Sequence, residues 1–151
     1  MEVVGLKGSS PAIERHKGFV DALKQYPSIE SVATLQGDWT QESAVKAVTQ
    51  WLSTPQGQQA ATLGIDYVFG QNDRMAMGVR KVLENVAGLS PRYCGIDGLP
   101  GKQGGIQFVV DSLLDASYIY PTHGDQLLQM AVDILSMARN IVRRQCLCRP
   151  W

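Results

Sequence analysis

The stretch Tyr67-Val-Phe-Gly-Gln-Asn-Asp73 decides the fold of this chain. Its first three residues form a short strand-forming run, and Gly70 ends that run before three polar residues. Small and apolar residues then follow at helical spacing in Met75-Ala-Met-Gly-Val79. The pattern predicts a buried strand that leads into a helix, with an amide and a carboxylate on the connecting turn. In an open α/β sheet, ligands bind at such turns, beyond the carboxyl ends of the strands.

Outward from this stretch, strand-like and helix-like segments alternate five times. The predicted strands cover residues 3–6, 31–35, 67–70, 93–96 and 116–120. Helices are predicted for residues 11–25, 41–52 and 74–86, with a short amphipathic piece at 105–110 and a long last helix whose apolar stripe runs from 127 to 142. Ser10 is the expected N-cap of the first helix, and Thr40 starts the second. Residues 53–57 either end that second helix or continue it briefly.

This alternation of strands and helices is typical of βαβ units. Crossovers between parallel strands are right-handed, which places helices against the sheet. We therefore expect an α/β fold: a doubly wound, mainly parallel sheet of five to six strands with helices on both faces. The 151 residues are enough for one such domain with its own core.

Charge and composition exclude some classes of partner. Lys and Arg together number 14, as do Asp and Glu, so the formal net charge is zero. A neutral chain gives no electrostatic reason to expect nucleic acid as a partner. Met1 leads directly into a strand-like run without signal-peptide features, and no apolar run of about 18 residues could span a membrane. Because the chain opens inside a strand, we interpret it as a fragment.

The three cysteines predict neither a disulfide framework nor a metal site. Their number is odd, and the spacing of Cys146 and Cys148 is not that of a CxxC motif. Cys94 falls in a predicted strand, where we expect a small core residue. Residues 143–151 fit no periodic pattern, so we expect a disordered or non-native tail, with a juxtamembrane basic segment as the alternative.

Polar and aromatic side chains come from all five units, on the strand-to-helix turns or just after them. Because these turns open at one edge of a parallel sheet, we expect the side chains to converge there. Carboxylates and amides pair with hydroxyl groups, Arg offers a fork of donors, and a Trp ring covers the apolar face of a sugar. The set therefore suits a polyhydroxylated ligand. Its members are Arg15, Asp38, Trp39, Asn72, Asp73, Asp97 and Tyr120.

Several of these residues also have a purely structural interpretation. Asp38 and Asp73 both fit helix N-caps, because Asp is favoured at that position. Arg15 fits a solvated surface residue, and Asp97 fits a turn former. Trp39 is harder to assign to structure alone, because an exposed Trp usually covers another group. The shared position at one edge of the sheet favours the binding-site interpretation.

No arrangement of residues indicates catalysis or a cofactor. His16 and His123 are far apart in sequence and form no ligand-spaced pair. The stretch Gly5-Leu-Lys-Gly-Ser-Ser10 matches neither nucleotide-binding loop pattern, and its serines lie outside a G-x-S-x-G elbow. We therefore expect no enzymatic activity, no cofactor and no metal ion.

Four motifs occur in a fixed order along the chain. They are Gly8-Ser-Ser-Pro-Ala-Ile-Glu-Arg-His-Lys-Gly-Phe19, Gly37-Asp-Trp39, Val68-Phe-Gly-Gln-Asn-Asp73 with Met75-Ala-Met-Gly78, and Gly95-Ile-Asp-Gly98. Over residues 1–142, their order and spacing resemble the type I periplasmic sugar-binding proteins of the ribose-binding kind. Those proteins hold a sugar between two α/β lobes joined by three crossing strands. The resemblance implies that residues 1–120 form the second lobe, that residues 121–142 form a helix that packs on the first lobe, and that the first lobe is missing.

The resemblance also implies roles for five residues. Arg15 is similar to the family's sugar-binding Arg, and Trp39 stands where the family has an aromatic ring that stacks on the sugar. Asn72 and Asp97 match the amide and the carboxylate that bind hydroxyl groups. Tyr120 lies near the hinge, where ribose binders often have Gln, so the sugar need not be ribose. The expected ligand is a small monosaccharide.

The run Ala116-Ser-Tyr-Ile-Tyr-Pro-Thr-His-Gly124 is similar to the hinge region of periplasmic sensor domains in hybrid two-component regulators. We therefore expect a carbohydrate-binding sensor lobe in the periplasm, within a membrane-anchored parent protein that carries a histidine kinase elsewhere. The alternatives are the solute-binding protein of a sugar ABC transporter and the cytoplasmic effector domain of a LacI-type repressor. Without the first lobe, the apolar stripe of residues 121–142 favours a homodimer.

Overall fold

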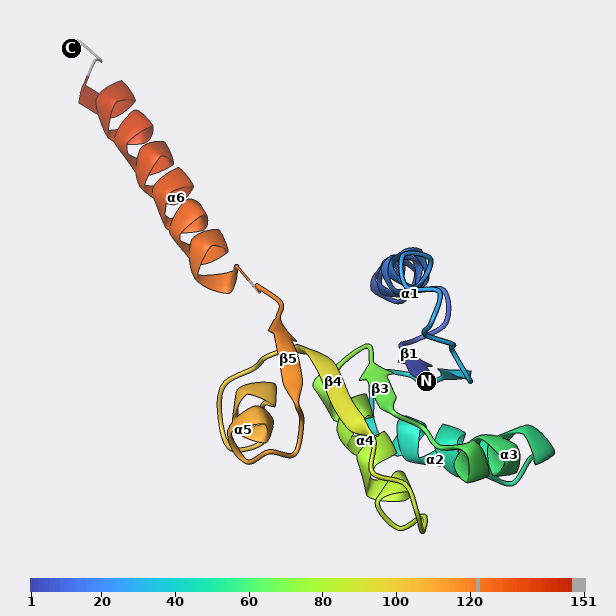
Figure 1. Ribbon diagram of the computed structural model, residues 1–151. Coiled ribbons are helices and arrows are strands. Elements are labelled where there is room, and N and C mark those ends of the chain that lie inside the picture. Colours follow the sequence, from blue (N-terminus) through green and yellow to red (C-terminus); the bar gives the residue numbers. More distant parts are fainter. Residues whose placement is uncertain (122, 148–151) are drawn as a thin grey trace. The chain divides into compact units, whose positions relative to one another are not determined.

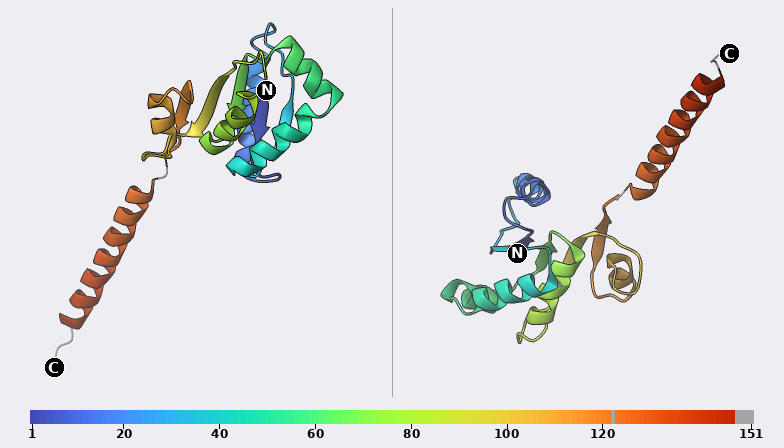
Figure 2. Two further views of the ribbon diagram at one scale, coloured as in Figure 1. Left: turned by 90° about the horizontal axis from the view of Figure 1, so that it is seen from below. Right: turned by 180° about the vertical axis from the view of Figure 1, so that it is seen from behind.

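The computed structural model describes residues 1–121 and 123–147, and their side chains up to residue 137. The chain divides into two compact units, residues 1–120 and residues 121–151. The first unit holds the sheet and the shorter helices, and the second holds one long helix (Figures 1 and 2). In the described part of the chain, no helix is long and apolar enough to cross a membrane.

The first unit is built on a five-stranded parallel sheet (Figure 1). Its strands are β1 (Glu2–Val4), β2 (Thr34–Gln36), β3 (Tyr67–Gly70), β4 (Arg92–Asp97) and β5 (Ala116–Ile119). They lie in the order β2-β1-β3-β4-β5, and each neighbouring pair is parallel. The predicted α/β fold with a parallel sheet is confirmed. Because the strand order reverses direction at β1, a topological switch point lies between β1 and β3.

Five helices connect or follow these strands. They are α1 (Ser10–Leu23), α2 (Gln41–Leu52), α3 (Pro55–Leu63), α4 (Asp73–Leu83) and α5 (Gly105–Val110). The N-cap of α1 is Ser9, one residue before the predicted cap, and its side chain makes no capping bond. Thr40 caps α2 by accepting a hydrogen bond from the Ser43 N–H. Residues 53–57 end α2 and also start α3, because Thr54 caps a new helix that begins at Pro55.

The main core lies between one face of the sheet and the helices α2 and α4. Val68 of β3 is only 1% exposed and belongs to this core. The two helices contribute the buried side chains of Ala44, Val48, Met75, Val79 and Leu83. They approach each other closely at Gly78 of α4, where a Cβ atom would overlap the carbonyl oxygen of Gln41 and lie 2.9 Å from the Ala44 side chain.

The opposite face of the sheet carries α1. Successive strand residues point to opposite faces, so Phe69 lies on the face away from Val68. Its ring stacks on Phe19 of α1, with the ring centroids 5.3 Å apart. The helix fully buries only Ala12, and an apolar groove of about 700 Å³ lies between its C-terminal half and β3. Cys94 is half-buried and lines this groove, so the prediction of a core cysteine is wrong.

The second unit is formed by α6 (Gly124–Leu147). The helix continues beyond the predicted stripe, so part of the expected tail is helical, while residues 148–151 lie outside the described residues. Large apolar side chains on its described part are open to solvent. Six of them are each 60% exposed or more: Leu127, Leu128, Met130, Ile134, Leu135 and Met137.

The contact between α2 and α4 predicts a matched pair of glycine variants. Gly78→Ala is expected to destabilise the chain by roughly 1–3 kcal/mol, because the new methyl group overlaps the α2 backbone. Gly18→Ala in α1 has open space around its Cβ and is expected to be neutral or to stabilise by about 0.5–1 kcal/mol. Urea denaturation measures both, and equal stability of the two variants would contradict the close packing at Gly78.

Candidate functional site

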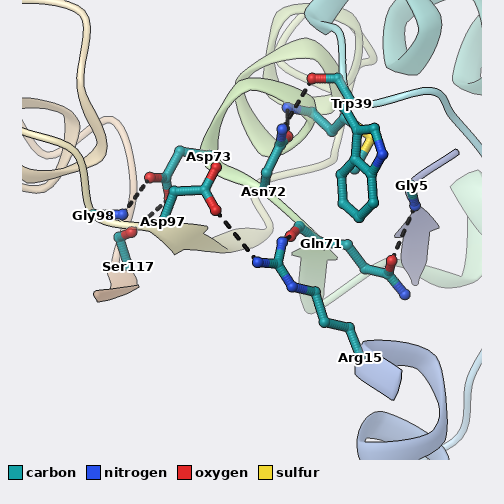
Figure 3. A network of polar contacts seen from close by, with 10 residues as sticks. Gly5, Arg15, Trp39, Gln71, Asn72, Asp73, Asp97, Gly98 and Ser117 are labelled. Atoms are coloured by element: carbon teal, nitrogen blue, oxygen red, sulfur yellow. Dashed lines mark hydrogen bonds and ion pairs between the residues drawn. The ribbon is translucent and has the colours of Figure 1, made fainter. Parts of the chain in front are cut away.

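Polar and aromatic side chains gather at the carboxyl ends of the strands. Trp39 follows β2, Asn72 follows β3, Asp97 ends β4, and Tyr120 follows β5. Arg15 reaches the same edge from α1, as Figure 3 shows. The structure thus brings together all five residues that the resemblance singles out, because parallel strands all end on the same side of the sheet.

The Arg15 guanidinium lies at the centre of this cluster. One of its Nη atoms donates a hydrogen bond to the backbone oxygen of Gln71, and the other lies 3.4 Å from Asp97 Oδ1. Its Cζ is 5.4 Å from the centre of the Trp39 ring and 5.2 Å from that of Tyr120, distances at which a cation is attracted to a ring face. The side chain is only 14% exposed, so Arg15 is not the solvated surface residue of the alternative interpretation.

Asp97 combines an unusual backbone with a raised pKa. Its φ of 119° lies in the region that favours glycine. The backbone there is held by the Tyr120 N–H, which donates to the Asp97 carbonyl oxygen at 3.0 Å. Burial raises the pKa of the Asp97 carboxyl, and the positive charge of Arg15 opposes that rise. The side chain remains 30% exposed, so a ligand can reach it.

Trp39 is also held in a positive-φ conformation, with a φ of 77°. Its indole ring lies directly against Gly5, where a Cβ atom would overlap the ring. Its backbone oxygen accepts a hydrogen bond of 2.9 Å from Asn72 Nδ2 (Figure 3). The position of the ring therefore depends on a glycine after β1 and on an amide after β3.

The polar turn after β3 is organised differently from the prediction. Asn72, not Asp73, is the N-cap of α4, and its Oδ1 accepts a hydrogen bond of 2.8 Å from the Met75 N–H. Asp38 is likewise not the cap of α2, because Thr40 fills that position. Instead, Asp38 Oδ1 accepts hydrogen bonds from the Thr40 N–H and hydroxyl at 3.0 and 2.6 Å. The cap predictions for Asp38 and Asp73 are therefore wrong, since neighbouring side chains reach the free N–H groups.

Asp73 connects the turn after β3 to the residue after β4 and to β5 instead of capping a helix. It is 4% exposed and accepts hydrogen bonds from the Gly98 N–H at 2.9 Å and from the Ser117 hydroxyl at 2.6 Å. Burial raises the pKa of its carboxyl, and these two hydrogen bonds oppose the rise. Since Gly98 follows Asp97 directly, Asp73 helps to hold the turn that carries Asp97.

Sequence reasoning missed two residues behind the cluster, Glu2 and Gln71. Both are fully buried, and Gln71 Nε2 donates a hydrogen bond of 2.9 Å to Glu2 Oε1. The available signal was a charged residue at the start of a parallel strand, where apolar residues are usual. Gln71 stood in the quoted turn, but its burial could not be read from its neighbours.

The cluster offers hydrogen bonds and aromatic surfaces to a ligand. Arg15 supplies donors and Asp97 an acceptor, while the half-buried Trp39 and the exposed Tyr120 supply ring faces. Among the residues that the structure describes, no group of three His, Cys, Asp or Glu side chains could hold a metal ion.

Comparisons with known proteins show what the chain is similar to. Residues 1–139 match the family model described as periplasmic binding protein domain. The chain is 29% identical over 115 residues to the galactofuranose-binding protein YtfQ of Escherichia coli (strain K12), a match that covers 76% of this chain and 34% of that protein.

Two solved structures are also similar. The fructose-binding periplasmic domain of the hybrid two-component system BT1754 is 39% identical, with a TM-score of 0.72, over 90% of this chain and 43% of that one. The binding protein of the arabinose ABC transporter from Shewanella sp. ANA-3 is 23% identical, with a TM-score of 0.71, over 89% and 43%. This chain spans less than half the length of each of these three relatives. Because the family model matches residues 1–139, the chain belongs to the family of periplasmic binding protein domains.

Proposed function

We propose that this chain is the sugar-binding second lobe of a periplasmic sensor. The observation that carries the proposal is the Arg15 cluster, in which one cation lies near two aromatic rings and a carboxylate at the carboxyl edge of a parallel sheet. Neighbouring hydroxyl groups of a sugar can bond to a guanidinium and a carboxylate at once. The C–H faces of the same sugar can pack on the rings.

In this proposal, five residues contact the sugar. Arg15 donates hydrogen bonds to hydroxyl oxygens, and Asp97 accepts hydrogen bonds from hydroxyl groups. Trp39 and Tyr120 cover the apolar faces of the ring. Asn72 already bonds to Trp39 and to the α4 backbone, so it offers its second N–H and its remaining lone pair.

A sensor role is supported by the 39% identity to the fructose-binding periplasmic domain of a hybrid two-component system. For the same reason we place the chain in the periplasm, with a histidine kinase elsewhere in its parent protein. The second candidate is a sugar-transport binding protein, supported by the 28% identity to an ABC transporter periplasmic solute binding protein from Actinobacillus succinogenes 130z with bound D-allose, over 75% of this chain. For a LacI-type effector domain, the third candidate, only the fold can be compared: the transcriptional regulator CelR in its cellobiose complex is 24% identical, with a TM-score of 0.51.

The other half of the binding site would come from a first lobe. The chain spans 43% of the fructose-binding domain that it resembles, and its cluster would contact a ligand from one side. A sugar held between two lobes favours the closed arrangement, because a ligand shifts an equilibrium towards the state that it binds more tightly. Residues 121–142 would pack on that first lobe, which would cover the apolar side chains of α6.

The isolated chain is expected to bind sugars weakly or not at all. Only one side of the ligand is contacted, so the binding free energy lacks the contribution of the second lobe. Calorimetry with fructose, and separately with arabinose, measures the affinity. Micromolar binding by the isolated chain would show that this lobe is a complete site and would overturn the two-lobe proposal.

Arg15 is expected to dominate the affinity once a first lobe is joined to residues 1–142. Arg15→Ala should weaken sugar binding by about 1.5–3 kcal/mol, the range for hydrogen bonds to charged groups. Arg92→Ala is the matched control, because Arg92 is exposed at the amino end of β4, away from the cluster. Calorimetry on the joined protein compares the two variants. An equal effect of both would contradict the proposed site.

Without a first lobe, the chain is expected to form homodimers through residues 121–142. Exposed apolar patches of this kind drive association. Leu127→Gln with Leu135→Gln should shift the chain towards monomers, whereas Leu63→Gln in α3 removes a 79% exposed leucine from the first unit and should not. Light scattering at high protein concentration gives the mass. A strictly monomeric chain counts against association through α6.

A further inference from the structure

A buried polar pair, Glu2 and Gln71, lies behind the candidate site and makes none of the proposed sugar contacts. Both side chains are fully buried, Glu2 at the start of β1 and Gln71 on the turn between β3 and α4. Gln71 Nε2 donates to Glu2 Oε1 at 2.9 Å, and the other Glu2 oxygen lies 2.7 Å from His16 Nδ1. Burying a charged group is unfavourable unless hydrogen bonds compensate, so such a pair needs an explanation.

Every polar group of Gln71 is bonded to the scaffold of the site. Its Oε1 accepts a hydrogen bond of 3.0 Å from the N–H of Gly5, the residue on which the Trp39 ring rests. Its Nε2 also donates to the Ala12 carbonyl oxygen in α1 at 3.2 Å. Its backbone oxygen accepts from Arg15. Gln71 therefore bonds both to Gly5, against which the Trp39 ring lies, and to the Arg15 guanidinium (Figure 3).

The helix that carries Arg15 has little buried apolar packing beside these polar bonds. Only Ala12 of α1 is fully buried, and a groove separates the C-terminal half of the helix from β3. The Phe19–Phe69 stack is one apolar anchor at that end. Towards the N-terminal half, the contacts of Ala12 with Gln71 and of His16 with Glu2 set the rotation of the helix. That rotation decides where the Arg15 side chain emerges.

We propose that Glu2 and Gln71 are positioning residues that hold Arg15 and Trp39 in place before a ligand arrives. Ligand binding is strengthened when groups are ordered beforehand, because less conformational freedom is lost on binding. The part of the inference that concerns ligand binding rests on the proposed sugar-binding function. Its structural part, the placement of Arg15 and Trp39 in the free chain, can be measured without any sugar.

The first test exchanges the amide and the carboxylate. Gln71→Glu alone places two carboxylates against each other, and should displace α1 and change the NMR signals of Arg15 Nε–H and the Trp39 indole N–H in the 151-residue chain. Adding Glu2→Gln restores one amide facing one carboxylate, and should return both signals part of the way towards their original positions, because a carboxylate at position 71 still cannot donate to the Ala12 carbonyl oxygen. The control is Gln58→Glu, the same chemical change at an exposed position of α3, which should leave both signals unchanged.

A second variant separates the effect of the pair on the positions of Arg15 and Trp39 from its effect on the stability of the folded chain. Glu2→Leu with Gln71→Leu keeps both positions buried and makes them apolar, a replacement that chains often tolerate, but it removes the bonds to Gly5 and Ala12. We expect a folded chain with altered Arg15 and Trp39 signals. Unchanged signals in this variant, or no recovery in the exchange variant, would overturn the inference.

Sugar binding is measured separately, in the protein joined to a first lobe. The exchange variant should bind more tightly than Gln71→Glu alone. The Leu pair should bind roughly tenfold more weakly than the parent, because two side chains must then be ordered on binding. If the NMR signals respond as expected but neither protein binds sugar, the proposed function fails while the positioning by Glu2 and Gln71 stands. If the parent binds sugar and the Leu pair binds equally well, the positioning inference fails while the proposed function stands.

Discussion

The guanidinium of Arg15 is the charge on which the arrangement of the site depends. It is 14% exposed, so its charge must be satisfied largely by protein groups. Its partners are Gln71 after β3, Asp97 at the end of β4, Trp39 after β2 and Tyr120 after β5. One side chain from α1 therefore contacts residues at the ends of four strands. Because the strands are parallel and their ends lie at one edge, a single cation can reach all of them.

The polar turn after β3, residues 71–73, holds this arrangement together. Each of its three residues bonds to a different set of elements. Gln71 bonds to β1, to Gly5 after it and to α1. Asn72 bonds to Trp39 and α4, and Asp73 bonds to Gly98 after β4 and to Ser117 within β5. Trp39 and Asp97 both have positive φ angles, conformations that cost on the order of 1–3 kcal/mol each. The hydrogen bonds from this turn offset part of that cost. Strained residues cluster at functional sites, which agrees with the proposed role of Trp39 and Asp97 as ligand contacts.

The fold and the gathering of polar residues at one edge of the sheet could be predicted from local patterns, while the contacts between those residues could not. Alternating strand and helix segments gave the parallel sheet, and the central strand was predicted with its observed bounds, Tyr67–Gly70. The caps were assigned wrongly because several side chains near a helix start can reach the same N–H groups. Asn72 caps α4 where Asp73 was expected, and of the two residues considered at the start of α2, Thr40 and Asp38, only Thr40 is the cap. Cys94 was expected in the core, but on the α1 face it meets a groove, since one helix does not cover that face.

The sequence by itself determined the order of the elements, the parallel arrangement and the edge of the sheet where polar residues gather. Hydrophobic periodicity and turn residues act over a few positions, so they can be read directly along the chain. Only the tertiary structure decided which polar group faces which. The partners of Arg15 are 56 and 82 positions away in sequence, and Glu2 bonds to Gln71 across 69 positions. Such pairings depend on how the folded strands and helices are placed, because no local pattern records the distance between side chains so far apart along the chain.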